Sequence, residues 1–364
     1  MIASDDGRAQ TPEAASTGRL NRPREIGVGI VGLGMAVAPH MLAIRDLEAE
    51  GRVRLLGGFS PSAQRRGAFA QAWGAPVFLS LEALLAAPGL DLVIVLTPPG
   101  AHLPVAEACA AAGKHLLVEK PLERTVDRAE ALAALAARAD VTLGVVFQHR
   151  FRPAALRLKQ AIAAGELGTL LSCSASIRWW RDAAYFAQPG RGTMARDGGG
   201  VLLTQAIHTL DLLLHLAGPV SRVAGFARTS PLRAIDTEDI AAAALRFANG
   251  AIGAVDATTV AEPGFPERIE IAGTGGSAAL VAERLELHLK GRLPEVLDRG
   301  LAGGGGADPM AFDHGPHRAM IAEMLDAIEQ GRPPSHAGAT GLPVLRLIEA
   351  ILASSVSGSF VDLG

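Results

Sequence analysis

Between residues 26 and 147, short runs of apolar residues alternate with longer alanine-rich stretches whose apolar positions recur at helical spacing. Apart from a polar residue at the start of some of them, these short runs are continuously apolar, which is typical of parallel strands buried on both faces. The predicted strands are Ile26–Val31, Arg54–Phe59, Asp91–Leu96, His115–Val118 and Thr142–Val146. The predicted helices are Ala38–Glu48, Ala63–Trp73, Leu81–Ala86, Ala101–Ala112 and Val126–Ala139. This alternation predicts an α/β unit with a doubly wound parallel sheet.

The pattern changes after about Gln148, where strands begin to dominate. Two helices (Ala154–Ala163 and Val201–Leu216) flank a strand, Leu170–Trp180, before six further strands follow. These six are Val220–Arg228, Ile240–Phe247, Ala251–Thr258, Arg268–Ala272, Ala278–Val281 and Leu285–Leu289. Asn249-Gly250 is a strong hairpin signal. We therefore expect an α+β domain with a mostly antiparallel open sheet and helices on one face, and two late helices (Arg318–Gln330 and Val344–Ser354) packed back onto the body.

Composition narrows the class of protein. The 364 residues carry a formal net charge of -3 and no dense basic run, so we expect no nucleic-acid partner. No apolar run approaches the roughly 18 residues of a membrane-spanning helix, and we expect no membrane partner. Residues 1–22 lack an apolar stretch, which predicts a disordered tail without a secretory signal and a cytoplasmic protein. The two cysteines lie in apolar segments and are expected to be reduced and buried.

A dinucleotide site is predicted where the first strand meets the first helix. Gly32 allows a tight turn, and Gly34 lets a phosphate approach the backbone at Gly34-Met35, so the pyrophosphate lies at a helix N-terminus. Residues 23–147 are therefore interpreted as a Rossmann domain, and residues 148–364 as a substrate and oligomerisation domain. The second predicted strand ends without the carboxylate that usually holds the ribose of NAD. Ser60 and Arg65 follow instead, which favours NADP slightly over NAD.

Two further segments predict catalytic chemistry. Glu119-Lys120-Pro121 follows a buried strand, which leaves the Lys120 ammonium at the carboxyl edge of the sheet, where open α/β sheets bind ligands. Thr204, His208, Asp211 and His215 form a polar stripe on a leucine-rich helix preceded by three glycines. We expect this stripe to line a cleft, with His208 accepting a hydroxyl proton and Lys120 stabilising the alkoxide.

Taken in order, these motifs resemble the Gfo/Idh/MocA oxidoreductase family over nearly all of residues 24–364. The matching pieces are Gly32-Leu33-Gly34 with His40, Thr97-Pro98-Pro99-Gly100-Ala101-His102, Gly113-Lys114-His115, Glu119-Lys120-Pro121 and Gly198-Gly199-Gly200 with His208 and Asp211. The resemblance implies an NAD(P)-dependent dehydrogenase or reductase that acts on CH–OH groups of a sugar, cyclic polyol or sugar derivative. It also implies a homodimer or homotetramer. It makes Lys120 and His208 the catalytic pair, and it assigns cofactor contacts to Thr97, Pro98, His102, Glu119 and Arg150.

One position departs from the family pattern. Many members carry Asp four residues before the histidine, and this chain has Thr204, which cannot act as a carboxylate base. The phrase around Thr204 is more similar to the branch that acts on nucleotide-linked amino sugars. The segment Arg178–Thr193, with Trp180 and Arg191, could stack on a sugar ring and bind carboxylate or phosphate, or serve as a packing loop. Thr204, Asp211, Trp180 and Arg191 are the predicted substrate contacts.

Two other functions remain possible for a chain with these motifs, and one histidine pair could suggest a metal site. Some family relatives cleave glycosides by transient oxidation with a bound NAD, and a third possibility is a non-catalytic sensor that kept the nucleotide pocket. Retention of both Lys120 and His208 argues against a sensor. No metal site is predicted, because His314 and His317 have only Asp308 and Asp313 near them in the sequence.

Overall fold

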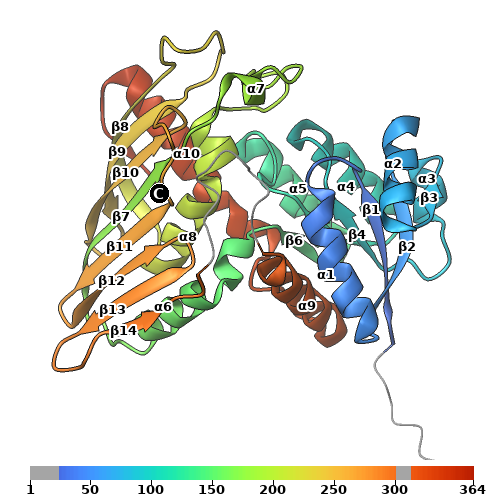
Figure 1. Cartoon of the computed structure of the whole chain (residues 1–364), viewed down its shortest axis with the longest axis horizontal. Helices are drawn as coiled ribbons and strands as arrows, with labels where there is room; N and C mark the ends of the chain where they lie inside the picture. Colours follow the sequence, from blue (N-terminus) through green and yellow to red (C-terminus); the bar gives the residue numbers. More distant parts are fainter. Residues whose placement is uncertain (1–23, 301–312) are drawn as a thin grey trace, which may run out of the picture.

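The computed structural model describes residues 24–300 and 313–364, and it contains two sheets that lie side by side (Figure 1). The predicted tail at residues 1–22 and the glycine run Gly303–Gly306 lie outside the described residues. The first sheet is built from the N-terminal part of the chain and the second from the C-terminal part, as the change of pattern after Gln148 predicts.

The first sheet has six parallel strands in the order β3-β2-β1-β4-β5-β6. Its strands are β1 (Ile26–Val31), β2 (Val53–Phe59), β3 (Val77–Phe78), β4 (Leu92–Val95), β5 (His115–Val118) and β6 (Leu143–Val145). All five predicted strands are confirmed to within one or two residues at their ends. The two-residue β3 was not predicted. The strand order reverses between β1 and β4, and this is the point at which doubly wound sheets bind dinucleotides.

Successive side chains of the central strands point to opposite faces of the sheet, and each face belongs to a different hydrophobic cluster. Val93 and Val95 of β4 face one core with helices α4 and α5, whereas Leu92 and Ile94 face the other with helix α1. The helices around this sheet are α1 (Val37–Ala49), α2 (Ala63–Trp73), α3 (Leu81–Leu85), α4 (His102–Ala111) and α5 (Val126–Arg138). Both faces of the sheet are therefore covered, which explains why its strands read as continuous apolar runs.

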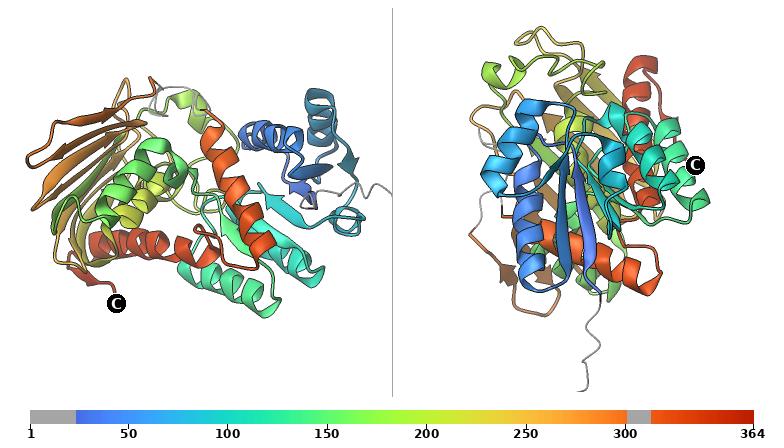
Figure 2. Two further views of the ribbon diagram at one scale, coloured as in Figure 1. Left: turned by 90° about the horizontal axis from the view of Figure 1, so that it is seen from below. Right: turned by 90° about the vertical axis from the view of Figure 1, so that its right-hand side faces the viewer.

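The second sheet has nine strands in the order β14-β13-β12-β11-β7-β10-β9-β8-β15. Every neighbouring pair is antiparallel except β7 with β10. The strands are β7 (Leu170–Arg178), β8 (Val220–Arg228), β9 (Ile240–Phe247), β10 (Ile252–Thr258), β11 (Arg268–Gly273), β12 (Gly276–Val281), β13 (Arg284–Leu289), β14 (Glu295–Leu297) and β15 (Val361–Asp362). The short strands β14 and β15 were not predicted. Figure 2 shows helices on one face of this sheet and, among residues 24–300 and 313–364, none on the other, in agreement with the predicted open α+β domain.

Three helices cover the inner face of the second sheet: α6 (Pro153–Ala163), α8 (Ile207–Ala217) and α10 (Leu342–Ser357). The four-residue helix α7 (Ala183–Phe186) lies in the long connection after β7. The segment Gly338–Ser357, which ends with α10, is by length and composition apolar enough to cross a membrane. It packs against β8, and 44% of its most apolar window is buried.

Helix α9 (Gly315–Gln330) comes from the C-terminal part of the chain but packs against α1 of the first domain. Its buried residues Met320, Ile321 and Met324 join Met41 and Ile44 of α1 in one hydrophobic cluster. The first core is therefore completed by residues that lie far along the sequence.

Candidate functional site

A cavity of about 590 Å³ opens at the carboxyl ends of the first sheet's strands and extends toward the second domain. Its walls include the turn after β1, the segment after β4, the residues that follow β5 and the short 3-10 helix Gln148–Phe151 after β6. Helices α8 and α9, the long connection around α7 and the ends of β11 and β12 complete it. The cavity thus lies at the edge where open α/β sheets bind ligands.

The turn after β1 is shaped for close approach. Gly32 has φ 99°, and a Cβ on it would come within 2.6 Å of the main-chain atoms of Leu96 and Thr97. Gly34 and Met35 line the cavity directly before α1, and no side chain caps the helix N-terminus. The free N–H groups there are suited to bind phosphate.

Of the two cofactor contacts predicted after β2, only one lines the cavity. Arg65 lines the cavity, and its guanidinium approaches Gly34. Ser60 is buried and does not line the cavity, because its hydroxyl turns toward the main-chain nitrogen of Ser62. Arg66 donates to the main-chain oxygens of Ser60 and Pro61 at 2.6 and 3.1 Å. The prediction for Ser60 therefore needs correction, whereas Arg65 remains placed to meet a ligand.

After β4, Thr97 and Pro98 line the cavity, and the Thr97 hydroxyl is buried without a hydrogen-bond partner among the described residues. His102 was predicted as a cofactor contact, but it is completely buried behind this wall. Its ring nitrogens lie 2.9 Å from the Thr97 oxygen and 3.1 Å from the Leu122 oxygen. His102 therefore positions the segment that carries Thr97 and does not itself reach the cavity.

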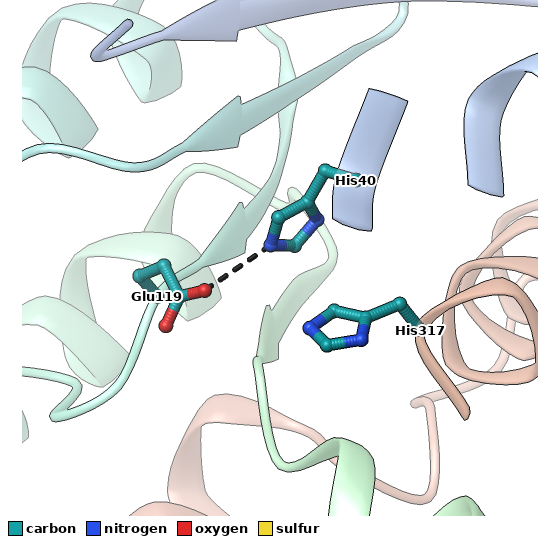
Figure 3. A group of neighbouring side chains, drawn as sticks. All are labelled: His40, Glu119 and His317. Atoms are coloured by element: carbon teal, nitrogen blue, oxygen red, sulfur yellow. Dashed lines mark hydrogen bonds and ion pairs between the residues drawn. The ribbon is translucent and has the colours of Figure 1, made fainter. Parts of the chain in front are cut away.

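Glu119 lies beside two histidines from distant helices and is hydrogen-bonded to one of them, His40 (Figure 3). Its Oε1 lies 3.1 Å from His40 Nε2 of α1, and its Oε2 accepts a hydrogen bond from the Lys120 main chain at 2.9 Å. The rings of His40 and His317 meet edge to face with centroids 5.0 Å apart. Burial opposes ionisation of Glu119, but His40, Lys120 and His317 outweigh it and lower the carboxyl pKa.

His317 and His314 do not form a pair, although they are near in sequence. His317 lies in the cavity wall, where burial and the neighbouring His40 lower its pKa to about 3. His314 Nε2 instead lies 2.8 Å from the carboxylate of Asp46 on α1. Asp308 lies outside the described residues.

Lys120 reaches from the end of β5 to the second domain. Its Nζ donates to the main-chain oxygen of Thr204 at 3.0 Å. Burial lowers the Lys120 pKa, Arg191 and Arg181 lower it further, and Glu119 opposes the change. A larger neutral fraction of the amine is thereby available to accept a proton.

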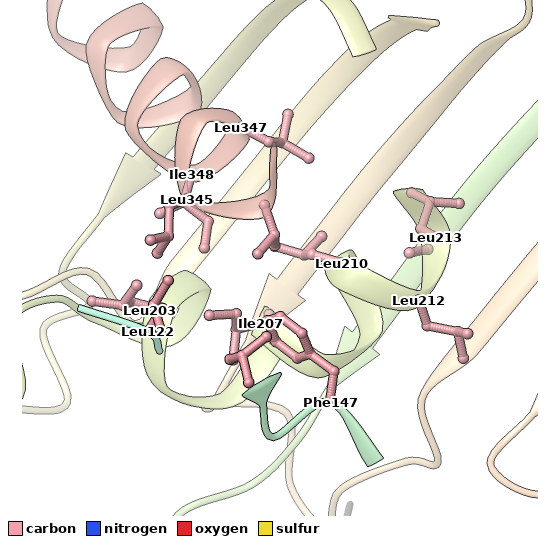
Figure 4. Packing of buried hydrophobic residues seen from close by; sticks show 14 of the residues in the cluster. Leu122, Phe147, Leu203, Ile207, Leu210, Leu212, Leu213, Leu345, Leu347 and Ile348 are labelled. Carbon is pink, nitrogen blue, oxygen red and sulfur yellow. The ribbon is translucent and has the colours of Figure 1, made fainter. Parts of the chain in front are cut away.

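The helix that carries His208 starts irregularly. Leu202–Ala206 wind as a π-helix, a form that is frequent at functional sites, and regular α8 begins at Ile207. Figure 4 shows Ile207 and Leu210 packed toward Leu345 and Ile348 of α10. This packing anchors one face of the helix in the core, and Thr204 and His208 on another face line the cavity.

The polar stripe predicted on this helix is only half correct. Asp211 is buried outside the cavity lining and accepts a hydrogen bond from Arg150 Nε at 2.7 Å. Burial raises the Asp211 pKa to about 6, and the Arg150 guanidinium limits the rise. Arg150 also donates to Thr340, so neither residue lines the cavity as predicted. His215 does not line it either, and its main-chain oxygen accepts from Lys159.

His208 has an aromatic neighbour on each of two sides. Its ring stacks on His149 with centroids 4.7 Å apart and 25° between planes, and Phe147 meets it edge-on at 6.3 Å. Burial holds the His208 pKa well below its usual value, with further lowering by Lys120, Arg152 and His317. The imidazole is therefore neutral and able to accept a proton.

The long connection before the π-helix forms the roof of the cavity. Arg191 and Arg181 lie over the Tyr185 ring at 4.8 and 5.7 Å, and Arg191 also binds Asp197 at 3.2 Å. Trp179 lines the cavity, whereas Trp180 does not. Trp180 forms an antiparallel β-bridge with Val260, and the Arg233 guanidinium lies over its ring. The tryptophan in the cavity wall is therefore Trp179 and not the predicted Trp180.

Several lining residues were not predicted from the sequence. They are Gln148, His149, Arg152, Trp179, Gln205, Glu267 and Glu283. The first three follow β6, and the rule that strand ends of a parallel sheet face the ligand could have found them. Glu267 and Glu283 flank strands of the second domain, where no local signal distinguishes them from surface carboxylates.

The residues at the sheet edge fit a nicotinamide dinucleotide. The close-packed Gly32 turn, the uncapped start of α1, Arg65 and the unpartnered Thr97 hydroxyl offer donors for phosphate and ribose groups. Lys120 and His208, which are 88 positions apart in the sequence, line the same cavity beyond these residues. A substrate carbon placed between them would meet both proton-transfer groups.

Two family models match the chain. The oxidoreductase family model with an NAD-binding Rossmann fold (GFO_IDH_MocA) matches residues 26–147, and the GFO/IDH/MocA C-terminal domain model matches residues 155–279. D-apiose dehydrogenase of Paraburkholderia graminis is 29% identical over 348 residues, which are 92% of this chain and 88% of that protein.

Solved structures are similar over almost the whole chain. The WlbA dehydrogenase from Bordetella pertussis, in complex with NADH and UDP-GlcNAcA, has a TM-score of 0.81 and 30% identity. The match covers 94% of this chain and 99% of that one. Levoglucosan dehydrogenase in complex with NADH and levoglucosan has a TM-score of 0.84 and 25% identity, with 93% and 99% covered.

Proposed function

Because the chain belongs to the Gfo/Idh/MocA family of oxidoreductases, we propose that it oxidises a secondary hydroxyl of a sugar or polyol with Lys120 and His208 as the proton-transfer pair. The observation that carries this proposal is the meeting of these two side chains in one cavity with the Gly32–Gly34 turn. Dehydrogenases of sugars and inositols are among its relatives, which supports the substrate class.

The bound nicotinamide supplies the hydride acceptor, and the protein moves the hydroxyl proton. Lys120 and His208 both have lowered pKa values, so both can accept that proton in the neutral form. The Lys120 ammonium that results would stabilise negative charge on the substrate oxygen during the reverse reaction. Thr204 contributes its main-chain oxygen, which orients the Lys120 amine.

The roof of the cavity favours an acidic substrate. Arg181, Arg191 and Arg196 line it, and Asp197 in the same wall binds Arg191 and the main-chain nitrogen of Gly192 and lies 3.7 Å from Arg196. A carboxylate on the substrate would complement this group of guanidinium side chains beside Lys120. We therefore propose a sugar acid or an acidic sugar derivative as the substrate.

The test is a spectrophotometric assay of the purified protein with NAD⁺ or NADP⁺. The panel pairs neutral and acidic sugars, such as glucose with glucuronate and galactose with galacturonate, and adds D-apiose, levoglucosan and myo-inositol. We expect net nicotinamide reduction that requires both Lys120 and His208, with the acidic member of a pair preferred. Glycoside cleavage without net reduction would replace this proposal with the hydrolytic one, and binding of cofactor without any turnover would favour a sensor.

We also propose that the bare face of the second sheet joins two copies of this chain. Its exposed positions include the apolar or small residues Phe226, Ala242, Ala244 and Ala254, and they also carry ion pairs such as Arg178–Asp256 and Arg268–Glu270. A flat face of this composition can pack on an identical face. Light scattering after size exclusion should give at least a dimer, and Phe226→Arg should shift it toward the monomer.

A further inference from the structure

Two stacked imidazoles lie at the reaction site, although the proposed chemistry needs one. His149 follows β6 and lines the cavity, and its ring lies against that of His208 from α8. Two cationic rings at this separation would repel each other strongly in a buried site. Which of the two rings takes a proton therefore matters for the mechanism.

The hydrogen bonds of His149 decide its protonation state. Arg152 Nη2 lies 2.7 Å from His149 Nε2. A guanidinium can only donate, so Nε2 must be the acceptor and the ring proton must be on Nδ1. His149 Nδ1 is buried and has no hydrogen-bond partner among the described residues, so no contact there favours the other tautomer.

Arg152 is itself held firmly. Its Nη1 donates to Glu267 at 2.8 Å and lies 3.4 Å from the Ala282 oxygen, and its Nε is 3.6 Å from Glu283. Arg152, Glu267 and Glu283 are all more than nine-tenths buried. The two carboxylates come from either side of the β11–β12 hairpin, so the second sheet holds the arginine against His149.

Burial and the neighbouring groups with the largest effects disfavour the cationic form of His149. Burial has the largest effect on its pKa and holds it well below the usual value. Arg152, His208 of α8, Lys120 at the end of β5 and His317 of α9 lower it further. Glu267 and Glu283 bind Arg152 and are separated from the imidazole by it.

We propose that Arg152 fixes His149 as the neutral Nδ1–H tautomer, so that His149 is a positioning residue whose uncharged ring orients His208, the imidazole that exchanges the substrate proton. This proposal rests on the proposed role of His208 in proton transfer. His149 then keeps a flat neutral surface against His208 whether His208 is neutral or protonated, and such a surface stabilises the imidazolium.

The tautomer can be measured without substrate or cofactor, so failure here is distinct from failure of the proposed function. Nitrogen-15 NMR of the histidine-labelled protein should show one side chain protonated at Nδ1 that does not titrate between about pH 5 and pH 8. His149→Phe should remove this signal, and the control His288→Phe, an exposed position on β13, should not. A His149 signal that titrates near its ordinary pKa, or one protonated at Nε2, would overturn the proposal.

Kinetics provide a second measurement on the full-length protein. His149→Phe keeps a flat ring and should leave kcat within about threefold, whereas His149→Leu should lower kcat about tenfold with little change in KM. Arg152→Met frees Nε2 beside two carboxylates, so kcat should gain an acid limb near neutral pH, and Arg152→Lys should suppress that limb. Adding His149→Phe to Arg152→Met should remove it; an acid limb that persists in the double variant contradicts the proposal. If Arg152→Met does not fold, the NMR measurement still decides the tautomer.

Discussion

Lys120 Nζ donates a hydrogen bond of 3.0 Å to the main-chain oxygen of Thr204, which lies one helical turn before His208. This contact joins the end of β5 in the first domain to the π-helical start of α8 in the second. Because the acceptor is a main-chain atom, the contact survives the replacement of the usual aspartate by Thr204. The separation of the two proton-transfer groups is thus set by the backbone and not by the side chain at position 204.

Lys120→Met should remove proton transfer without disturbing the fold, because methionine has a similar length but no charge. We expect kcat for sugar oxidation to fall by about 10²- to 10⁴-fold. Lys114→Met is the matched control, since Lys114 Nζ binds the Leu90 main-chain oxygen away from the cavity. Steady-state kinetics at saturating cofactor provide the measurement, and equal activity of the two variants would contradict the assigned role.

Arg191→Met should change the pH dependence of oxidation. Arg191 lowers the Lys120 pKa, so its removal should raise that pKa and move the rising limb of the kcat profile to higher pH. We expect a shift of up to about one pH unit. Arg65→Met, which removes a charge from the other end of the cavity, should leave the limb in place. A shift to lower pH, or no shift, would show that Arg191 does not act on Lys120.

Arg65→Ala should weaken binding of NADP more than binding of NAD. If its guanidinium meets the 2′-phosphate, KM for NADP should rise about tenfold while KM for NAD changes little. The neighbouring Arg66→Ala is the control, because Arg66 binds the main-chain oxygens of Ser60 and Pro61 and should affect stability instead of cofactor choice. Equal effects of Arg65→Ala on both cofactors would remove the preference for NADP.

Glu323→Gln should make the free energy of unfolding depend less on pH under acidic conditions. Burial opposes ionisation of Glu323, but His336, Arg332 and the Ser335 main chain bind the carboxylate and lower its pKa to about 2. The folded-state pKa is thus below the unfolded value of about 4.3, so this stabilisation is present above that value and is lost as pH falls toward 2. Urea unfolding at several pH values should show a shallower loss of stability for the variant between about pH 5 and pH 2, and an unchanged slope would contradict the interpretation.

Gly32→Ala should impair the nucleotide turn. Its Cβ would lie 2.6 Å from the Leu96 carbonyl carbon and Thr97 nitrogen, at a φ of 99° that alanine rarely adopts. We expect a loss of about 1–3 kcal/mol of folding stability together with weaker cofactor binding. Gly67→Ala is the control, because this glycine lies within α2 with open space around it and the substitution should be neutral or stabilising. Thermal unfolding with and without NADH measures both effects.

The sequence predicts the parts of the fold that local patterns determine. Continuous apolar runs predicted the five longer parallel strands, and Asn249-Gly250 predicted the β9–β10 hairpin. Strands β3, β14 and β15 have two or three residues and depend on pairing with a neighbour already in place. Strand β6 is also short, but it lies inside the longer apolar run at residues 143–147, whereas the runs at β3, β14 and β15 are too short to indicate a strand.

The site residues that follow strand ends could be predicted from the sequence. Those whose orientation depends on a contact with a distant segment could not. Lys120 could be placed because β5 ends there, and His208 because its helix has an unusual polar face. Asp211 belongs to the same face by helical spacing, but Arg150 from another segment binds it and removes it from the cavity. Whether Trp179 or Trp180 faces the ligand depends on where β7 ends, and the prediction extended that strand by two residues.

The core of the nucleotide-binding domain is complete only after helix α9 has been synthesised. Met320, Ile321 and Met324 fill the core beside α1, and His317 of the same helix forms part of the cavity wall. A ribosome that has produced only the first half of the chain therefore leaves an apolar surface on α1 without its cover. Contacts across this sequence separation of more than 270 residues form slowly. The nascent Rossmann unit is accordingly the stage of biogenesis at which aggregation or chaperone binding is most strongly favoured.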